Sequence, residues 1–344
     1  MKTKLNVVKF FIGIDISKAT FNYCLRYGGS NVVNGKVSNN VESINEFILL
    51  LKSTPEFKIA YAVFGMEVTG VYGLILINTL TKIKAKIVVE PALRIKNSLG
   101  IIRGKNDKLD AARIARYLIK NLQELKFWVP RRKIIDELSS LSTLRERMVR
   151  VKTIICTPLI EDDGFIDSTI SKANIDLCSP SITHVNQLIT EVDDRIKQLW
   201  NNDSHCKRLM QIMLSVMGIG DVTALQMLIH TNEFNSITTA RTFASYCGVA
   251  PFEIDSGTSV KKAARVSEHA NKRIKSLLHN GARTCIGHDP EIKAYYKRRV
   301  EVDKKKKRSV MNAIKFKIIC RVFSCIRGDR LYERGYISKP PSRA

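Results

Sequence analysis

Residues 10–18 read FFIGIDISK, an apolar run that carries one carboxylate, at Asp15. An ionised carboxylate inside a buried strand is costly unless it is paired or binds a cation. The arrangement recurs at residues 59–67, where Glu67 closes a second apolar segment, and two further carboxylates follow at Asp107 and Asp110. Because Mg²⁺ prefers oxygen ligands and leaves positions open for phosphate oxygens, these four acids together predict a magnesium site.

The segments around this run alternate between strand and helix patterns. Strand character is found in residues 7–14, 20–27, 32–37, 59–64 and 85–89. Helical spacing is found in residues 43–51 and 71–80, and again from Pro91 onward. The turn GGSN at residues 28–31 predicts a hairpin, and Ser43 with Glu46 has the form of a capping box. Strands that alternate with helices predict an α/β domain with a central, partly parallel sheet.

A helix predicted at residues 107–119 brings two of the acids together. The i, i+3 spacing places Asp107 and Asp110 on one face, where the two charges repel unless a cation lies between them. Any one acid alone is better explained as a surface charge or a helix cap, but the strand-end positions of Asp15 and Glu67 weaken that explanation for the set. Three lysines lie beside the acids, as expected near a polyanion: Lys18, Lys105 and Lys108.

Composition limits the class of protein. The chain has 344 residues, 44% of them hydrophobic, so it can bury a full core and is predicted to form two domains. A net charge of +25 is typical of a protein with a phosphate-rich partner. A membrane surface is the rival polyanion, but no apolar run reaches the roughly 20 residues that span a bilayer. Lys9 and Asp15 interrupt the N-terminal apolar run, so we expect a first strand of a cytoplasmic protein there and not a signal peptide.

The eight cysteines are scattered without a CxxC pair, and the six histidines form no HxxxH or HxH pair. Reduced and mostly buried thiols are the simplest interpretation of this pattern. A zinc site is therefore not expected.

The middle of the chain, residues 125–205, is predicted to be a helical connector. Amphipathic patterns cover residues 134–155 and 184–200, and the Ser-, Asp- and Pro-rich span between them is predicted to be a loop. A coiled-coil arm for self-association and a helical hairpin within one chain explain these patterns equally well.

A second domain is predicted to begin at residue 206. Its first helix, at residues 209–217, is broken by GIGD at residues 218–221, and a second helix follows. Such a turn can present backbone N–H groups to a phosphate at the N-terminus of the new helix. Gly218 and Gly220 therefore predict a nucleic-acid contact like that of a helix-hairpin-helix element, although a plain helical turn fits as well.

Ser256 lies in a sequence context that suggests a nucleophile. Residues 246–258 read YCGVAPFEIDSGT, and we expect a loop at Ser256. A serine among cations and beside a metal-activated phosphate could attack DNA and hold it covalently, so that strands are rejoined without ATP. A Ser-Gly pair in a loop is ordinarily just a turn. Four cations follow it: Lys261, Lys262, Arg265 and Lys272.

A basic run occupies residues 295–321. Such a run is usually a solvated face, but in a chain this basic we expect it to contact phosphates. Tyr295 and Tyr296 could stack on bases. The candidate phosphate contacts are Arg298, Arg299, Lys304, Lys305, Lys306 and Lys307.

Three motifs in the first part of the chain resemble those of the Piv/MooV-type insertion-sequence transposases. They are DISK at residues 15–18, EVTGVY at residues 67–72 and KNDKLDA at residues 105–111. The resemblance implies a RuvC-like, RNase H-like first domain. It carries the family's DEDD tetrad, one residue at a time, onto Asp15, Glu67, Asp107 and Asp110.

The later segment resembles the C-terminal transposase domain of the same family. GVAP at residues 248–251 precedes the Ser-Gly pair, and a basic segment leads to Asn271 and a helix expected to end at residues 281–283. In that family the serine before glycine is the nucleophile, so the role falls on Ser256, with Ser259 as the second choice. Five positions depart from the family's pattern: Glu90, Asn106, Glu268, Ala270 and Lys275.

The sequence therefore predicts a DNA transposase or recombinase. We expect a RuvC-like DEDD domain at residues 1–124, a helical or coiled-coil connector at 125–205, a mostly helical transposase domain at 206–325 and a basic tail at 326–344. The alternatives are a RuvC-type junction nuclease in which water attacks, and a non-catalytic protein that binds RNA or DNA.

The resemblance also implies partners. They are DNA, a structured bridge RNA that chooses the target by base pairing, and further copies of the chain, in a dimer to tetramer that combines the tetrad of one subunit with the serine of another. The expected ion is Mg²⁺, with Mn²⁺ as a substitute, and the expected location is the nucleoid of a bacterial or archaeal cell.

Overall fold

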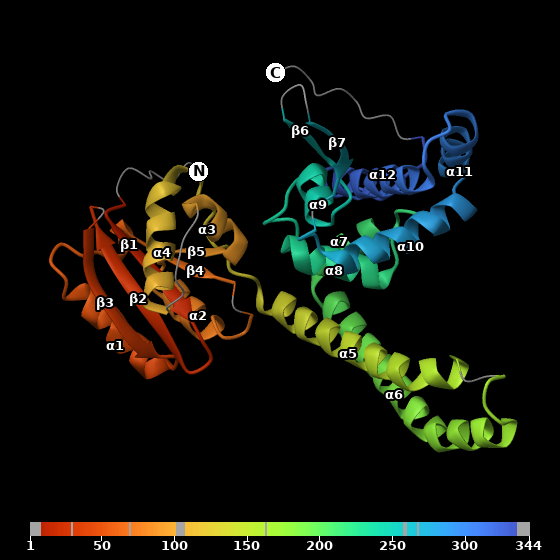
Figure 1. Ribbon diagram of the computed structural model, residues 1–344, viewed down its shortest axis with the longest axis horizontal. Coiled ribbons are helices and arrows are strands. Elements are labelled where there is room, and N and C mark those ends of the chain that lie inside the picture. The colour runs from red at the N-terminus through yellow and green to blue at the C-terminus, as the bar shows by residue number, and fades with distance from the viewer. Residues whose placement is uncertain are drawn as a thin grey trace. The chain divides into compact units, whose positions relative to one another are not determined.

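The structure is a computed structural model that describes residues 8–28, 30–68, 70–100, 107–161, 164–256, 260–266 and 268–335. Side chains of residues 31, 32, 107, 108, 252–256 and 260–265 lie outside this description, although their backbone belongs to strands or a helix. The chain divides into two compact units, Met1–Pro130 and Arg131–Ala344 (Figure 1).

A five-stranded sheet in the order β3-β2-β1-β4-β5 forms the centre of the first unit. Its strands are β1 (Phe10–Ile16), β2 (Thr20–Tyr27), β3 (Ser30–Ser38), β4 (Ala62–Glu67) and β5 (Lys86–Glu90). β1, β2 and β3 pair antiparallel, whereas β4 runs parallel to both β1 and β5. This mixed sheet confirms the predicted α/β architecture and the predicted hairpin.

Helices cover both faces of the sheet. They are α1 (Val41–Lys52), α2 (Leu74–Lys82), α3 (Ala92–Leu99) and α4 (Asp107–Lys120), with 3₁₀ turns at Ile59–Tyr61 and Leu122–Glu124. Because side chains alternate along a strand, Ile12 and Ile14 pack against α1 and α2, and Phe11 packs on the opposite face against α3 and α4. The first unit is thus a three-layer α/β/α domain.

The start of α1 differs from the prediction. Its N-cap is Asn40, whose Oδ1 accepts a hydrogen bond from the Ser43 backbone N–H at 2.8 Å. Asn is one of the strongest N-cap residues, and it begins the helix before Ser43 is reached. The predicted capping box at Ser43 is therefore wrong.

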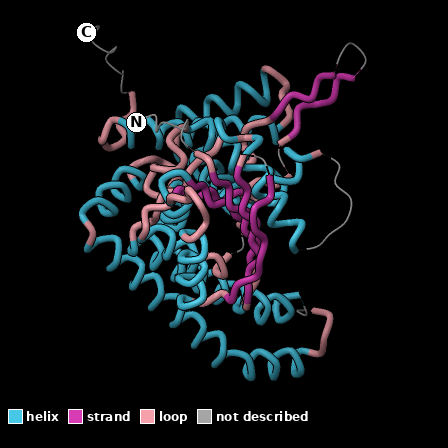
Figure 2. The backbone as a smooth tube through the Cα atoms, turned by 90° about the vertical axis from the view of Figure 1, so that its left-hand side faces the viewer, coloured by secondary structure: helices cyan, strands magenta, loops and turns pink. Residues whose placement is uncertain are grey.

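The second unit is mostly helical, as predicted. Its helices are α5 (Lys133–Glu161), α6 (Ser168–Asn202), α7 (Ser204–Leu214), α8 (Asp221–Thr231), α9 (Ala240–Tyr246), α10 (Lys272–His288), α11 (Pro290–Lys297) and α12 (Lys307–Arg327), with a π-helical turn at Arg298–Val302. Strands β6 (Phe252–Ser256) and β7 (Val260–Arg265) pair antiparallel, as a ribbon that projects from the helices of this unit (Figure 2).

α5 and α6 form an antiparallel hairpin within one chain, which we call the arm (Figure 1). Arg145 of α5 donates to both carboxylate oxygens of Asp193 in α6, at 2.5 and 3.0 Å. The loop predicted between the two helices is wrong for most of its length. α6 begins at Ser168 because Asp167 caps it. It continues through Pro180, although a proline inside a helix removes one backbone donor and its ring crowds the carbonyl four residues earlier.

A glycine contact joins two helical segments of the second unit. A Cβ at Gly281, in the middle of α10, would overlap the carbonyl oxygen of Gly218 in the turn before α8. The helix that was expected to end at residues 281–283 therefore continues to His288, because Gly281 permits close packing and does not stop the helix.

Candidate active site and nucleic-acid surface

Two of the four predicted acids end neighbouring strands. In the parallel pair β1 and β4, Ile14 is opposite Met66, and Asp15 and Glu67 each follow one residue later. Asp15 and Glu67 therefore lie side by side at the carboxyl edge of the sheet, and both are partly exposed. Because side chains alternate, both point to the face that α4 covers, the face of Phe11.

α4 comes unusually close to this face. A Cβ at Gly13 would overlap the carbonyl oxygen of Ala111 and the amide nitrogen of Ala115, so the strand and helix backbones meet only because residue 13 is glycine. Asp110 directly precedes Ala111, and Asp15 lies two residues beyond Gly13 on the same face. The contact thus packs the start of α4, which carries Asp110, on the strand that carries Asp15.

The Asp110 carboxylate has a fixed orientation. Its Oδ1 accepts a hydrogen bond from Arg113 Nη1 at 2.5 Å, across one turn of α4. Asp107 is the first residue of α4, one turn earlier, as the sequence predicted. The side chains of Asp107 and Lys108 lie outside the described part of the chain, as does the whole of Lys105.

Sequence reasoning missed a fifth carboxylate at this edge. Glu90 ends β5 directly opposite Glu67, and its buried side chain accepts hydrogen bonds from Arg94 at 3.0 and 3.2 Å. Burial raises the pKa of the nearby Tyr117 hydroxyl, and the charge of Glu90 raises it further. The signal was available, because Glu90 closes an apolar strand just as Glu67 does.

Asn39 is a second missed residue. Its Nδ2 donates to the carbonyl oxygens of Ser17 at 3.2 Å and Tyr72 at 2.9 Å, and so it joins the loops that follow β1 and β4. Its Oδ1 is sealed from water without a hydrogen-bond partner. No sequence pattern marks this residue, because its partners are separated from it by 22 and 33 positions.

The predicted loop at Ser256 is wrong. Ser256 is the last residue of β6 and pairs with Val260 at the start of β7. Apolar and polar residues alternate along β6, FEIDS, which suits a strand of an antiparallel ribbon. The side chains of Ser256, Lys261, Lys262 and Arg265 lie outside the described residues, and so does all of Ser259.

The Gly-x-Gly turn has the predicted position between α7 and α8. Gly218 has φ of +87°, a conformation that favours glycine, and Gly220 is the exposed N-cap of α8. Asp221 places a negative charge in the first turn of that helix. The negative charge of Asp221 would repel a phosphate bound at this helix N-terminus. The glycine at position 218 is explained more directly by its close packing against Gly281.

The predicted basic contacts are mostly exposed. Lys18 is exposed after β1, and Lys272 is exposed in the first turn of α10. Arg298 lies 5.8 Å from the Tyr295 ring, and Arg299 pairs with Asp303 at 2.8 Å. Lys304, Lys305 and Lys306 are exposed before α12, which begins with exposed Lys307.

A hydrogen-bonded cluster at the start of α10 was also missed. The Tyr246 hydroxyl lies 2.8 Å from His230 Nδ1 and accepts from Asn271 Nδ2 at 3.1 Å. Burial lowers the pKa of His230 to about 4, with help from Arg131 and Arg273, so the imidazole is neutral at neutral pH and its Nδ1 can accept the Tyr246 proton.

Comparison with known proteins identifies the family. Residues 12–156, which contain all four acids, match a transposase family model for the DEDD transposases of IS110 elements. Residues 210–297 match the Transposase IS116/IS110/IS902 family. The chain belongs to the IS110 family of transposases. Its activity is that of a DNA transposase or recombinase, and the DEDD domain implies dependence on a divalent metal.

Several curated proteins are similar to this IS110-family transposase. The pilin gene-inverting proteins of Moraxella bovis and Moraxella lacunata are each 27% identical over 330 residues, which cover 95% of this chain and 98% of theirs. An uncharacterized 43.6 kDa protein of insertion element IS110 from Streptomyces coelicolor is 26% identical over 184 residues, 51% of this chain and 44% of its own length.

A cluster of possible metal ligands in the second unit of the transposase has a different role. Asp203, Cys206 and Glu233 bring their ligand atoms together, but Arg132 already donates to Asp203 at 2.7 and 2.8 Å and also to Glu233. Burial and the two carboxylates raise the pKa of the Cys206 thiol to about 12, so it is a poor metal ligand. The cluster is an ion-pair network at the base of the arm.

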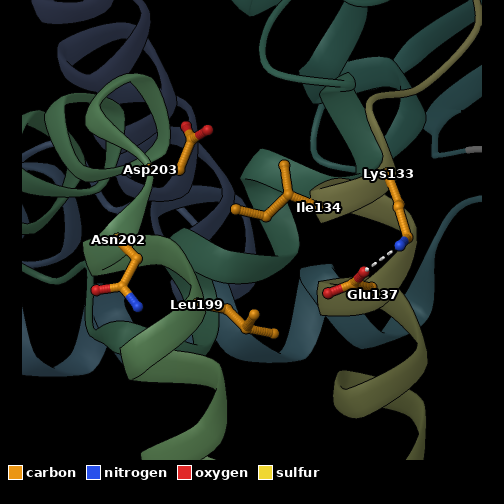
Figure 3. Close-up of a pocket in the computed structure, with 6 residues that line it drawn as sticks. All are labelled: Lys133, Ile134, Glu137, Leu199, Asn202 and Asp203. Atoms are coloured by element: carbon orange, nitrogen blue, oxygen red, sulfur yellow. Dashed lines mark ion pairs between the residues drawn. The ribbon is translucent and has the colours of Figure 1, made fainter.

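A pocket of about 340 Å³ lies beside this network (Figure 3). Its lining residues are Lys133, Ile134, Glu137, Leu199, Asn202 and Asp203. Lys133 and Glu137 pair at 3.7 Å, and the Asp203 carboxylate is held by Arg132. The pocket therefore offers no cluster of reactive groups.

Among the helices of the transposase that the structure describes, none is long and apolar enough to cross a membrane.

Proposed function

We propose that this IS110-family transposase cuts and rejoins DNA at the carboxyl edge of the sheet in its RuvC-like first domain. The observation that supports the proposal is the contact at Gly13, which packs the start of α4, the helix that carries Asp110, on β1, the strand that carries Asp15 next to Glu67 of β4. The proposal brings three acids on three different elements to one face of the sheet. Solubility alone does not require that arrangement.

The residues at this edge fit a divalent cation. Carboxylate oxygens are the ligands that Mg²⁺ prefers, and Asp15 and Glu67 are open enough to admit one. We assign as ligands Asp15, Glu67, Asp107 and Asp110, with Mg²⁺ as the ion and Mn²⁺ as a substitute. A cation bound there would stabilise charge on the attacking and leaving oxygens of an in-line displacement. Arg113 orients the Asp110 carboxylate.

We assign Ser256 as the nucleophile. Its Oγ would form a bond to a DNA phosphorus while the bond to the leaving strand breaks, with the serine proton lost and the leaving oxygen protonated. Attack by a new strand hydroxyl on the same phosphorus then releases Ser256, so rejoining consumes no ATP. The ribbon of β6 and β7 supports this role, because it puts Ser256 at the end of β6, and the paired strand β7 carries Lys261 and Lys262.

Guidance by a structured bridge RNA belongs to the same proposal. The net charge of +25 exceeds what a short duplex contact requires and suits a second nucleic acid. Base pairing to the RNA would choose the target, while the protein holds the backbones. Inversion of a DNA segment, the activity in the names of the two Moraxella relatives, is one product of such strand exchange.

The arm is the proposed site of self-association into a dimer to tetramer. Near its tip, where α5 ends and α6 begins, several large apolar side chains are exposed, among them Ile154, Phe165 and Leu177. Several large exposed apolar side chains in one part of a fold are typical of an interaction surface. A second copy could thus bring its serine to the tetrad of the first.

The chemistry is tested with two variants and matched controls. Asp110→Asn should abolish cleavage, whereas Glu42→Gln, which removes an exposed acid at the start of α1, should not. Ser256→Ala should abolish strand joining and the covalent protein–DNA adduct, whereas Ser43→Ala should leave both. Mass spectrometry should place the wild-type adduct on the peptide that contains Ser256. Mg²⁺ should raise the melting temperature of the wild type but not of an Asp15→Asn, Asp110→Asn double variant.

Three outcomes would decide against parts of the proposal. Wild-type cleavage by Ser256→Ala would identify water as the nucleophile and favour the junction nuclease. Full activity in excess EDTA would exclude the metal. A wild type that binds nucleic acid but never cuts it would be the non-catalytic binding protein.

A further inference from the structure

α10 and α12 pack against each other in the core of the second unit, through Ile274 and Leu278 on one side and Ile314 and Ile318 on the other. Neither helix contains an aspartate or a glutamate. Every cation on these two helices must therefore find an anionic partner elsewhere, remain in water, or stay unpaired.

Some of the cations do find partners. Arg273 of α10 pairs with Glu146 of the arm. Arg321 of α12 pairs with Asp289 at 2.7 Å and with Glu291 at 2.8 Å. Lys317 lies 4.8 Å from the ring centre of Tyr295. The fold thus supplies partners for these residues from the segments that surround the helix pair.

Lys315 is the exception. Only 4% of this residue is exposed, and no carboxylate or hydrogen-bond acceptor in the described part of the chain pairs with its ammonium group. A buried, unpaired cation is strongly unfavourable for folding. Burial, together with the charge of Lys275, lowers the pKa of Lys315 to about 8, so the group is still mostly protonated at pH 7.

The groups around Lys315 are also basic. Lys275, His279 and Arg283 follow one another at i, i+4 and i+8 on a single face of α10. Burial lowers the pKa of His279, and the nearby charges of Lys315 and Arg283 lower it further. The Lys315 ammonium group is not completely sealed, because among the described side chains the sealed polar atom without a partner is Asn39 Oδ1. A narrow opening to solvent therefore remains at this group, although the residue as a whole is 4% exposed.

We propose that Lys315 is the floor of a phosphate-binding site, with Lys275, His279 and Arg283 as its rim, and that the site holds a phosphodiester of a nucleic-acid backbone. A phosphate would supply the negative charge that both helices lack, through charge-assisted hydrogen bonds. The cost of burying Lys315 in the free protein is then offset in the complex.

The surface next to the site favours a polymer over a single phosphate ion. Arg308 precedes Lys315 by seven residues and so lies on the same side of α12, two turns or roughly 10 Å away. Exposed Lys304, Lys305 and Lys306 come just before it. A backbone that enters the site can therefore continue along the start of α12.

The test uses the full chain and compares Lys315→Met with Lys317→Met, which removes the same charge from a neighbouring position of the same helix. Lys315→Met should weaken binding of a fluorescein-labelled DNA duplex or single-stranded RNA roughly tenfold at low salt. It should also lower the slope of log K against log salt by about one unit. Lys317→Met should change both much less.

Stability gives an independent readout. Removing an unpaired buried cation should leave the melting temperature of Lys315→Met unchanged or raise it, the opposite of its effect on binding. Inorganic phosphate should raise the melting temperature of the wild type more than chloride at equal ionic strength, and this difference should vanish in Lys315→Met. Should Lys315→Met fail to fold, Lys275→Gln tests the rim through the same three measurements.

The proposal is wrong if Lys315→Met and Lys275→Gln bind DNA and RNA as the wild type does. It is also wrong if Lys315→Met loses only the effect of inorganic phosphate, because the site would then take a small phosphate ligand. The phosphate site at Lys315 depends on the proposed function in one respect only, namely that its ligand is a nucleic-acid backbone. A wild type that binds no nucleic acid would refute that function, whereas cleavage assays on Asp110→Asn and Ser256→Ala are independent of Lys315.

Discussion

Both units of the chain bring backbones together at a glycine, but the two contacts do different work. In the first unit, Gly13 lets α4 touch β1, and the residues next to the contact are Asp15 and Asp110. In the second unit, Gly281 of α10 meets Gly218, and the residues next to that contact belong to the apolar core, such as Ala282 and Cys285.

The same packing device therefore positions a candidate active site in one unit and a hydrophobic core in the other. A Cβ would meet rigid backbone atoms at both glycines, at 2.1 and 2.3 Å for Gly13 and at 2.1 Å for Gly281, where the next atom is at 3.1 Å. The functional consequences should differ, since only Gly13 lies under the carboxylates. This difference can be measured separately in each unit, because the two tryptophans, Trp128 and Trp200, lie in different units.

Gly13→Ala should have the largest effect. The added methyl group must push α4 away from β1, at a cost of about 3 kcal/mol in the free energy of unfolding, and it should also abolish cleavage and the stabilisation by Mg²⁺. Urea unfolding followed by Trp128 fluorescence in a Trp200→Phe background measures the first unit. Wild-type Mg²⁺ stabilisation in Gly13→Ala would show that the acids do not depend on this contact.

Gly281→Ala should destabilise the second unit by about 2 kcal/mol and leave the first unit and its Mg²⁺ response unchanged. The matched control is Gly287→Ala in the same helix, where a Cβ meets nothing within 4 Å. That control should stabilise the second unit by about 0.5 kcal/mol, because alanine loses less backbone entropy in a helix. Trp200 fluorescence in a Trp128→Phe background follows both variants, and equal effects from the two would contradict the packing explanation.

Gly65→Ala should cost less than Gly13→Ala, about 1 kcal/mol. The atoms that a Cβ at Gly65 would meet belong to the side chain of Leu118, which can change rotamer, and not to backbone. Cleavage should fall only in part, because Glu67 lies two residues further along β4 while α4 keeps its position. A loss of stability equal to that of Gly13→Ala would mean that Leu118 cannot move.

The smallest expected effect is the pH dependence of stability that comes from the Asp203–Arg132 ion pair. Hydrogen bonds from Arg132 hold the pKa of Asp203 well below its usual range, so the folded state favours the carboxylate. This stability is present above the unfolded pKa, near 4, and is lost as pH falls toward the folded value. Asp203→Asn should cost about 1 kcal/mol at pH 7, a modest amount because Arg132 is 43% exposed, and the difference from wild type should shrink below pH 4. A difference independent of pH would exclude the ion pair as its cause.

Local pattern was enough to predict much of the first unit. Alternating apolar residues indicated the strands, and helical spacing indicated α1 and α4, because each pattern reports which face of one element leaves water. The acids at Asp15 and Glu67 were noticeable for the same reason, since each interrupts or closes an apolar run. The family motifs, which are also local, led to the IS110 transposases.

The errors of prediction come from contacts between distant residues. Gly281 was taken as a helix end because a glycine usually weakens a helix, and only its approach to Gly218 explains why α10 continues. Ser256 was placed in a loop, but pairing with Val260 makes it part of a strand. The span around Pro180 was placed in a loop, although α6 runs through it beside α5.

The sequence by itself determined the α/β class of the first unit, the helical class of the second, the positive charge and the position of each candidate acid along the chain. Only the tertiary structure decided that the start of α4, which carries Asp110, packs on the strand that carries Asp15, and that Glu90 lies opposite Glu67. It also decided that Lys315 is buried without a partner among the described residues. The reason is physical. The periodicity of one segment shows which of its faces is buried, but the partners of a buried charge come from other segments, and their positions are fixed only when those segments pack.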